Sequence, residues 1–290
     1  MKNVYNDLKD ISFWNEYMPL DGQYYTYKNN ITFAACKISD LYYQVCNARM
    51  SIHFCLDYEK YSMMSEDKMA ILSTKKYFIE NALLYYNFAV DYLWQVLWFY
   101  YNNADDVNQI PSNELYQKLM KECNLNDLIR GLVELQERKI VEVLKDNFTD
   151  RNKLFKQIRE YYNYLKHRAI FHTPSLGINE KESMYYIPTL IEKNEEKVEL
   201  VSYKIPIISR IEIDIDELKE LLIEFDKQFV GICEYFFEII MPKDYIKARE
   251  VKLSTIQQYT GQHLEELKEY GKNHPKIVSK MECEVYLEEK

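Results

Sequence analysis

The stretch "ALLYYNFAVDYLWQVLWFYY", Ala82 to Tyr101, decides between a membrane protein and a helical globular protein. As a helix it is long enough to cross a bilayer. Asn87, Asp91 and Gln95 nevertheless lie within it at positions i, i+4 and i+8, which puts them on one side of the helix. An aspartate at the centre of a membrane helix costs about 2.5–3.5 kcal/mol on insertion scales. We therefore predict a buried helix with one polar edge and no membrane span.

The sequence on either side of this stretch favours further helices. Only 6 glycines and 7 prolines occur in 290 residues, and 47% of the residues are hydrophobic, which is enough for a large core. We expect a mainly α protein, an up-and-down helical bundle. Hydrophobic periodicity and helix-capping residues predict helices over residues 31–59, 68–103, 112–123, 126–145, 151–170 and 214–241. Asp150 is the predicted N-cap of the helix over 151–170, and Asp214 with Glu217 is a predicted capping pair at the start of the last helix.

A different pattern occupies residues 184–214. β-Branched and aromatic residues are frequent there, a polar turn falls at 194–197, and hydrophobic and polar residues alternate at 210–214. These features predict a small antiparallel β-meander inserted into the helical protein. We expect one domain at 31–241, preceded by an N-terminal arm at 1–30 and followed by a C-terminal helical extension at 242–290.

Charge and motifs exclude several classes of protein. The formal charge of −9, with 37 basic and 46 acidic residues, argues against a general binder of polyanions, so any contact with nucleic acid needs a local patch. The six cysteines lack the CxxC spacing of zinc sites and read as reduced thiols. No HExxH, GxGxxG or P-loop motif occurs, so we expect no metal and no cofactor. The first residues carry no apolar secretory run, which predicts a cytoplasmic protein.

A basic patch lies in and before the stretch "YYNYLKHRAIFHTPSLG", Tyr161 to Gly177. Residues 151–172 contain six Lys and Arg against one acid, Glu160, which inverts the sign of charge found in the whole chain. The six basic residues are Arg151, Lys153, Lys156, Arg159, Lys166 and Arg168. This segment is therefore the best candidate for contact with a polyanion.

A helical wheel divides this predicted helix into two faces. Asn163 and His167 fall opposite the apolar face, flanked by Arg159 and Lys166, so His167 is expected to point away from the core. At a spacing of four residues, the amide of Asn163 can contact the imidazole of His167 and orient it. The predicted core face consists of Leu154, Ile158, Tyr161, Leu165 and Ala169.

These residue types suit the cleavage of a phosphodiester without a metal. A histidine side chain has an ordinary pKa of about 6.5 and moves protons near neutral pH, while Arg and Lys stabilise charge on phosphate oxygens. In this interpretation His167 is the acid–base residue, Asn163 orients it, and His172 is a second proton carrier. The phosphate contacts are Arg159, Lys166 and Arg168. The alternative is a solvated basic helix end, where positive charge is favoured in any case.

The helix-borne run "NYLKHR" resembles the motif helix of the HEPN superfamily (higher eukaryotes and prokaryotes nucleotide-binding domains). The family signature is Arg, then a polar residue that is commonly Asn, then His, with four to six residues between Arg and His. Asn163 and His167 match the polar residue and the histidine, whereas Tyr162 stands at the Arg position. Seven residues lie between Arg159 and His167 and three between Arg168 and His172, so neither pair has the usual spacing. The run "NYLKHRAIFH" with "SLG" is also similar to HEPN-like proteins of low-GC bacteria.

The resemblance implies a homodimer whose motif helices face one another across a cleft. It also implies a metal-independent endoribonuclease in which the ribose 2′-hydroxyl attacks the phosphate. Members of the family act as toxins, some with an antitoxin partner, or in phage defence. Other members have lost catalysis and bind RNA, nucleotides or proteins. A noncatalytic helical module that binds a nucleotide or a protein therefore stays open as the second hypothesis.

Overall fold

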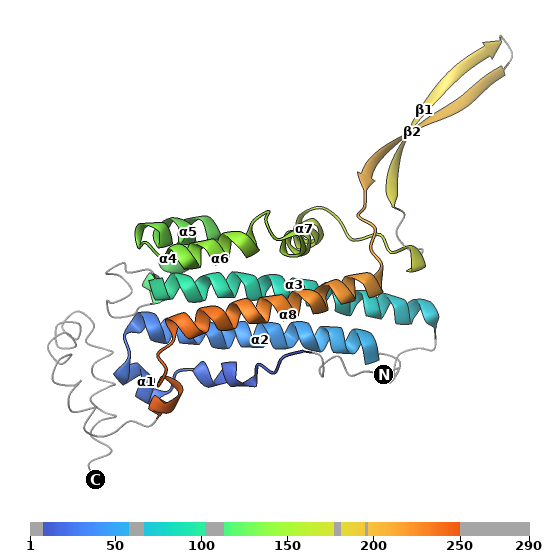
Figure 1. Ribbon diagram of the computed structural model, residues 1–290. Helices are drawn as coiled ribbons and strands as arrows, with labels where there is room; N and C mark the ends of the chain where they lie inside the picture. The colour runs from blue at the N-terminus through green and yellow to red at the C-terminus, as the bar shows by residue number, and fades with distance from the viewer. Residues whose placement is uncertain (1–7, 58–66, 102–112, 177–180, 195–196, 250–290) are drawn as a thin grey trace, which may run out of the picture. The chain divides into compact units, whose positions relative to one another are not determined.

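The computed structural model describes residues 8–57, 67–101, 113–176, 181–194 and 197–249, and within these ranges the protein is mainly helical (Figure 1). The predicted mainly α fold is confirmed. The helices are α1 (Asp21–Thr26), α2 (Asn29–Asp57), α3 (Lys68–Tyr101), α4 (Asn113–Glu122), α5 (Leu125–Glu134), α6 (Arg138–Phe148), α7 (Lys153–His167) and α8 (Ile215–Ile240), with short 3-10 helices at Ser12–Tyr17, Pro174–Leu176 and Ile246–Arg249. The predicted C-terminal extension lies almost wholly outside the described residues.

Helix α3 contains the stretch from Ala82 to Tyr101, and the polar edge of this stretch is turned inward. Asn87 is only 1% exposed, and Asp91 and Gln95 are half-buried. The Asn87 amide nitrogen donates to the carbonyl oxygen of Leu83 at 2.9 Å. Among the described residues, no helix combines the length and the apolar character needed to cross a membrane.

The chain divides into two compact units, each assembled from three segments. The first unit comprises residues 1–9, 43–90 and 142–232, and the second comprises residues 10–42, 91–141 and 233–290. Helices α2, α3 and α8 each contribute part of their length to both units. The domain boundaries expected from the sequence stay a prediction.

Aromatic packing forms the core of the first unit. The ring of Phe225 on α8 lies 5.4 Å from the ring of Tyr86 on α3 and 4.5 Å from that of Phe155 on α7. Helix α8 begins where the sequence predicted, because the carboxylate of Asp214 accepts the main-chain N–H groups of Asp216 and Glu217 at 2.8 and 3.0 Å. This cap orients the apolar face of α8 from its first turn.

In the second unit, part of the predicted N-terminal arm belongs to the core. Trp14 is fully buried and meets Phe237 of α8 edge-to-face at 5.1 Å. The ring of Tyr27 lies 5.0 Å from that of Tyr245, whose carbonyl oxygen accepts from the side chain of Gln23 at 3.1 Å. Residues 11–27 are therefore an integral part of this unit.

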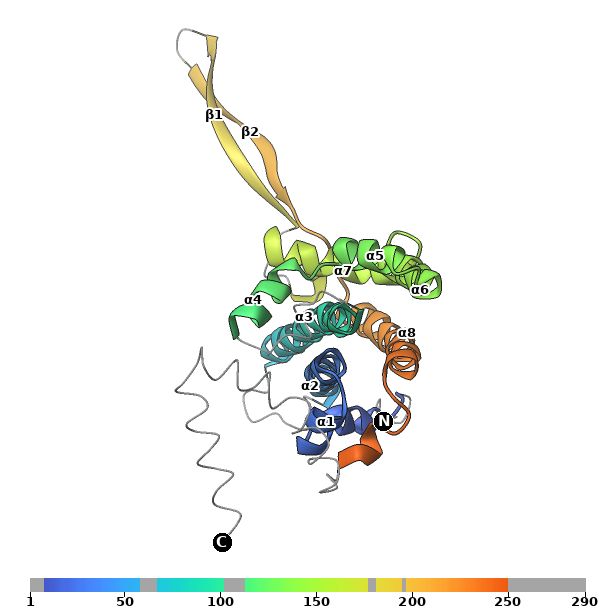
Figure 2. The same cartoon turned by 90° about the vertical axis from the view of Figure 1, so that its left-hand side faces the viewer.

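Two strands form an antiparallel hairpin in the first unit. Strands β1 (Glu182–Asn194) and β2 (Lys197–Ser209) pair along their whole length, from Glu182 opposite Ser209 to Asn194 opposite Lys197 (Figures 1 and 2). The prediction of antiparallel β structure is confirmed, but its extent differs. Residues 210–214 do not continue as a strand, because Glu212 forms an isolated parallel bridge with His172 instead.

The single helix predicted over 126–145 is wrong, because the structure has two helices, α5 and α6, in its place. Gln136 separates them with a positive φ of 62°. The N–H of Glu137 bonds the carbonyl oxygen of Leu132 at 2.9 Å, which is the six-to-one bond of a helix-ending turn. Glycine usually occupies such a position, so its absence removed the sequence signal for the break.

Candidate functional site

Helix α7 carries the candidate site, and Asn152 begins it. The side-chain oxygen of Asn152 accepts the N–H groups of Leu154 and Phe155 at 3.1 and 3.3 Å, as an N-cap does. The predicted cap, Asp150, instead lies outside the helix and pairs with Lys156 at 2.9 Å. The helix ends at His167, and the carbonyl oxygen of Tyr164 accepts the N–H groups of Arg168 and Ala169.

The buried face of α7 is rotated from the predicted one. Of the five predicted core residues only Ile158 is buried, whereas the other four are half-buried. The rotation follows from aromatic partners on neighbouring helices: Phe155 packs on Phe225 of α8, and Tyr162 meets Phe88 of α3 edge-to-face at 6.2 Å. The buried side chains are Phe155, Ile158, Tyr162 and Tyr164.

Tyr162, which stands where the HEPN signature has arginine, is therefore a core residue. It is 4% exposed, and two cations from the same helix lie over its ring. The guanidinium of Arg159 is 5.1 Å and the ammonium of Lys166 is 5.4 Å from the ring centroid. Cation–π attraction of this kind stabilises the packed ring and draws both charges toward it.

Arg159 makes a structural contact in addition. Its side chain is half-buried, and its Nη1 donates to the Oδ1 of Asn87 on α3 at 3.3 Å. Since Asn87 is buried, this bond ties α7 to α3 and supplies a donor to a buried amide oxygen. The structure thus holds Arg159 against α3, whereas the sequence analysis assigned it to phosphate binding.

Asn163 and His167 are both exposed, in agreement with the predicted wheel. No hydrogen bond joins their side chains in the described part of the chain. Lys166 and Arg168, on either side of His167, are exposed as well. The C-terminal turn of α7 therefore presents one imidazole, one amide and two cations to solvent.

The basic residues of α7 differ in how their charges are balanced. Lys156 pairs with Asp150, and Arg151, just before the helix, pairs with Asp146 at 2.6 Å. Among the described residues, no carboxylate pairs with Lys166 or Arg168. Uncompensated positive charge is thus concentrated at the end of the helix that carries His167.

The main chain holds His172, the second predicted proton carrier, in a fixed position. Its N–H donates to the carbonyl oxygen of Ile211 and its carbonyl oxygen accepts from Ile213, each at 2.9 Å. The preceding residue, Phe171, is fully buried, and its carbonyl oxygen accepts from the ammonium of Lys76 at 2.9 Å. Five residue steps keep the Cα atoms of His167 and His172 within about 18 Å of each other.

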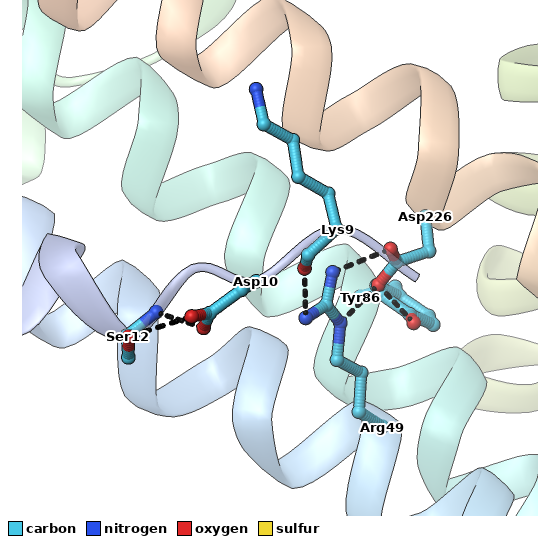
Figure 3. A network of polar contacts seen from close by, with 6 residues as sticks. All are labelled: Lys9, Asp10, Ser12, Arg49, Tyr86 and Asp226. Carbon is cyan, nitrogen blue, oxygen red and sulfur yellow. Dashed lines mark hydrogen bonds and ion pairs between the residues drawn. The ribbon is translucent and has the colours of Figure 1, made fainter. Parts of the chain in front are cut away.

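A second group of charged residues, which the sequence analysis missed, lies in the core of the first unit (Figure 3). The Nε and Nη2 of Arg49 on α2 each donate to the carboxylate of Asp226 on α8 at 2.8 Å. The hydroxyl of Tyr86 donates to the same carboxylate at 2.7 Å, and Arg49 Nη1 donates to the carbonyl oxygen of Lys9 at 2.9 Å. Burial disfavours the charge on Arg49, but the hydrogen bond and charge of Asp226 raise its pKa above the ordinary value.

This network is sealed from solvent and internally paired. Arg49 is 7% exposed and Asp226 is fully buried, so neither charge is accessible to a ligand. The sequence did contain a signal for it. Arg49 lies within the apolar stripe of α2, and Asp226 follows Phe225 on the apolar face of α8. Two opposite charges inside apolar stripes indicate a buried pair, which here serves packing.

The second unit also buries a cation. Lys37 is paired with Asp40 at 2.9 Å, and its ammonium lies 5.1 Å from the ring of Tyr92 and 5.3 Å from that of Tyr116. Its pKa is raised, because hydrogen bonds to Tyr116 and Asp40 outweigh the effect of burial. Within the described ranges, no group of three His, Cys, Asp or Glu residues is placed to hold a metal ion.

Comparisons of this chain with models of protein families, with curated proteins and with solved structures found no match.

Proposed function

We propose that this chain is a HEPN-like RNA-binding protein with metal-independent endoribonuclease activity at the C-terminal end of α7. One observation supports the proposal most directly. His167 is exposed between Lys166 and Arg168, and neither cation has a carboxylate partner among the described residues. In a chain of net charge −9, such a place attracts a phosphate and sets an imidazole beside it.

In the proposed reaction His167 accepts the proton of a ribose 2′-hydroxyl, and the 2′-oxygen attacks phosphorus. The bond from phosphorus to the 5′-oxygen breaks, and His172 gives a proton to that oxygen. The products are a 2′,3′-cyclic phosphate and a 5′-hydroxyl end. Lys166 and Arg168 stabilise the charge on the phosphate oxygens, and Asn163, one turn before His167, orients the imidazole once RNA is bound. Arg159 steadies α7 against α3 in this scheme.

The proposal includes a homodimer in which two α7 helices bring both His167 side chains to one cleft. A cytoplasmic toxin or phage-defence nuclease is the biological role that fits this activity. An antitoxin or another protein partner would then act by covering the end of α7.

A noncatalytic module that binds a nucleotide or a protein is the second candidate function. The observation that favours it is the burial of Tyr162 at the position of the family arginine, together with the engagement of Arg159 by Asn87. These contacts leave the signature without a free guanidinium at its usual place. Such a relic would bind RNA or a nucleotide at Lys166 and Arg168 without cleaving it.

One experiment distinguishes the two candidate functions. Purified protein is incubated with RNA in EDTA, and the ends of any fragments are analysed. We expect cyclic phosphate ends, lost in His167→Ala and kept in His53→Ala, a histidine on α2 that serves as the matched control. Circular dichroism checks that both variants fold. Equal cleavage by wild type and His167→Ala would refute the nuclease, and salt-sensitive binding without cleavage would favour the module.

A further inference from the structure

The main chain of a single residue, Ile211, links the two segments that carry the histidines of the proposed site. The N–H of Ile211, just after strand β2, donates to the hydroxyl of Tyr164 on α7 at 3.3 Å. The carbonyl oxygen of the same residue accepts the N–H of His172 at 2.9 Å. Helix α7, which carries His167, and the segment that carries His172 are thus joined through the main chain that returns from the β-hairpin.

Tyr164 makes this link through both its main chain and its side chain. Its carbonyl oxygen accepts the N–H groups of Arg168 and Ala169 and so defines the last turn of the helix. Its hydroxyl also lies 3.5 Å from the carbonyl oxygen of Ser209, the last residue of β2. The side chain is 6% exposed, so water does not readily replace these bonds.

The ring of Tyr164 fixes the intervening loop as well. It stacks on Phe171 with centroids 5.6 Å apart and an interplanar angle of 13°. Lys76 holds the carbonyl oxygen of Phe171 from α3. The segment between His167 and His172 is therefore held at its last residue, Phe171, and His172 itself is held by Ile211.

We infer that Tyr164 is a positioning residue that sets the spacing between His167 and His172 through the main chain of Ile211. The inference rests on the proposed function, because two proton carriers must reach opposite oxygens of one phosphate. The physical reason is geometric: acid–base groups act only within hydrogen-bond reach, and a displacement of about 1 Å can cost on the order of a hundredfold in rate.

Helix α7 itself offers a matched control. Tyr161 also contacts the ring of Phe171, edge-to-face at 5.6 Å, but its hydroxyl accepts from Gln157 on the same helix at 3.0 Å. Tyr164→Phe and Tyr161→Phe each remove one hydroxyl and keep the ring. Only the first removes a bond to the segment that holds His172.

The test compares both variants with the wild-type protein. In RNA cleavage we expect Tyr164→Phe to lower kcat by about tenfold or more with KM unchanged, while Tyr161→Phe behaves as the wild type. A loss of folded protein would also lower the apparent kcat with KM unchanged, so circular dichroism measures the folded fraction of each variant and kcat is calculated per folded molecule. If wild type cleaves RNA and Tyr164→Phe retains its kcat, the inference is wrong and the proposed function stands.

Amide hydrogen exchange supplies a readout that needs no activity. We expect the N–H groups of Ile211, His172 and Ile213 to exchange about tenfold faster or more in Tyr164→Phe than in Tyr161→Phe. If wild type does not cleave RNA, the proposed function fails, and faster exchange at these amides still supports the positioning role. Equal exchange in the two variants overturns it.

Discussion

The guanidinium of Arg49 and the carboxylate of Asp226 form a buried, doubly hydrogen-bonded pair, although 177 positions separate them in the sequence. Removing one member of such a pair leaves the other charge buried without a partner, which typically costs about 3–5 kcal/mol. Replacing both members with apolar residues avoids that cost. The pair therefore predicts a sharp difference between single and double variants.

We expect Asp226→Leu to lower the free energy of unfolding by about 3–5 kcal/mol, because Arg49 and Tyr86 both lose their acceptor. The double variant Arg49→Met with Asp226→Leu should lose markedly less than the sum of the single changes. Urea unfolding measures all three, with exposed Lys227→Ala as the neighbouring control. Additive losses would contradict a coupled pair.

Introducing the arginine of the HEPN signature at position 162 should damage the protein. Tyr162→Arg would bury a positive charge beside Arg159 and Lys166 and remove the ring on which both cations lie. We expect a loss of about 3 kcal/mol or more in the free energy of unfolding. The same substitution at exposed Asn163 should change stability by less than about 0.5 kcal/mol. Thermal or urea unfolding of Tyr162→Arg and Asn163→Arg measures the two losses of stability. Equal losses would mean that Tyr162 is not a core residue.

RNA binding should distinguish two lysines on α7. Lys166 has no carboxylate partner among the described residues, whereas Lys156 is paired with Asp150 and Glu160. We expect Lys166→Ala to lower the slope of log affinity against log salt by about 0.7 for a single-stranded RNA, and Lys156→Ala to leave it nearly unchanged. Titrations at several salt concentrations measure the slope. A larger change of the slope in Lys156→Ala than in Lys166→Ala would indicate that RNA binds near Lys156 instead.

Alkaline pH should weaken the protein through Cys55. Burial raises the pKa of its thiol from the ordinary value of 9.0 to about 11. The folded state therefore favours the protonated thiol, so this contribution is complete below about pH 9 and is lost as the pH rises toward 11. At about 1.4 kcal/mol per pKa unit, the loss is on the order of 2–3 kcal/mol. Urea unfolding at pH 8 and pH 10.5 should show a smaller decline for Cys55→Ala than for the wild type. Identical declines would show that other groups cause it.

Local sequence patterns predicted the helical elements and several of their ends. The scarcity of Gly and Pro predicted a mainly α protein, and Asp214 predicted the start of α8. The exposure of Asn163 and His167 also followed from the helical period alone. These features depend on a few neighbouring residues, so the sequence contains the information that decides them.

Contacts between distant segments decided the rest. Which face of α7 is buried depends on Phe88 of α3 and Phe225 of α8. A helical wheel drawn from the sequence of α7 alone does not include these two rings. The hydrogen bond from Arg159 to Asn87 likewise joins residues 72 positions apart. The sequence by itself therefore determined that the chain is mainly helical and placed His167 on the exposed side of its helix. Only the tertiary structure decided which side of α7 is buried and where Arg159 and Tyr162 lie, because side-chain packing between helices adds partners that local periodicity does not encode.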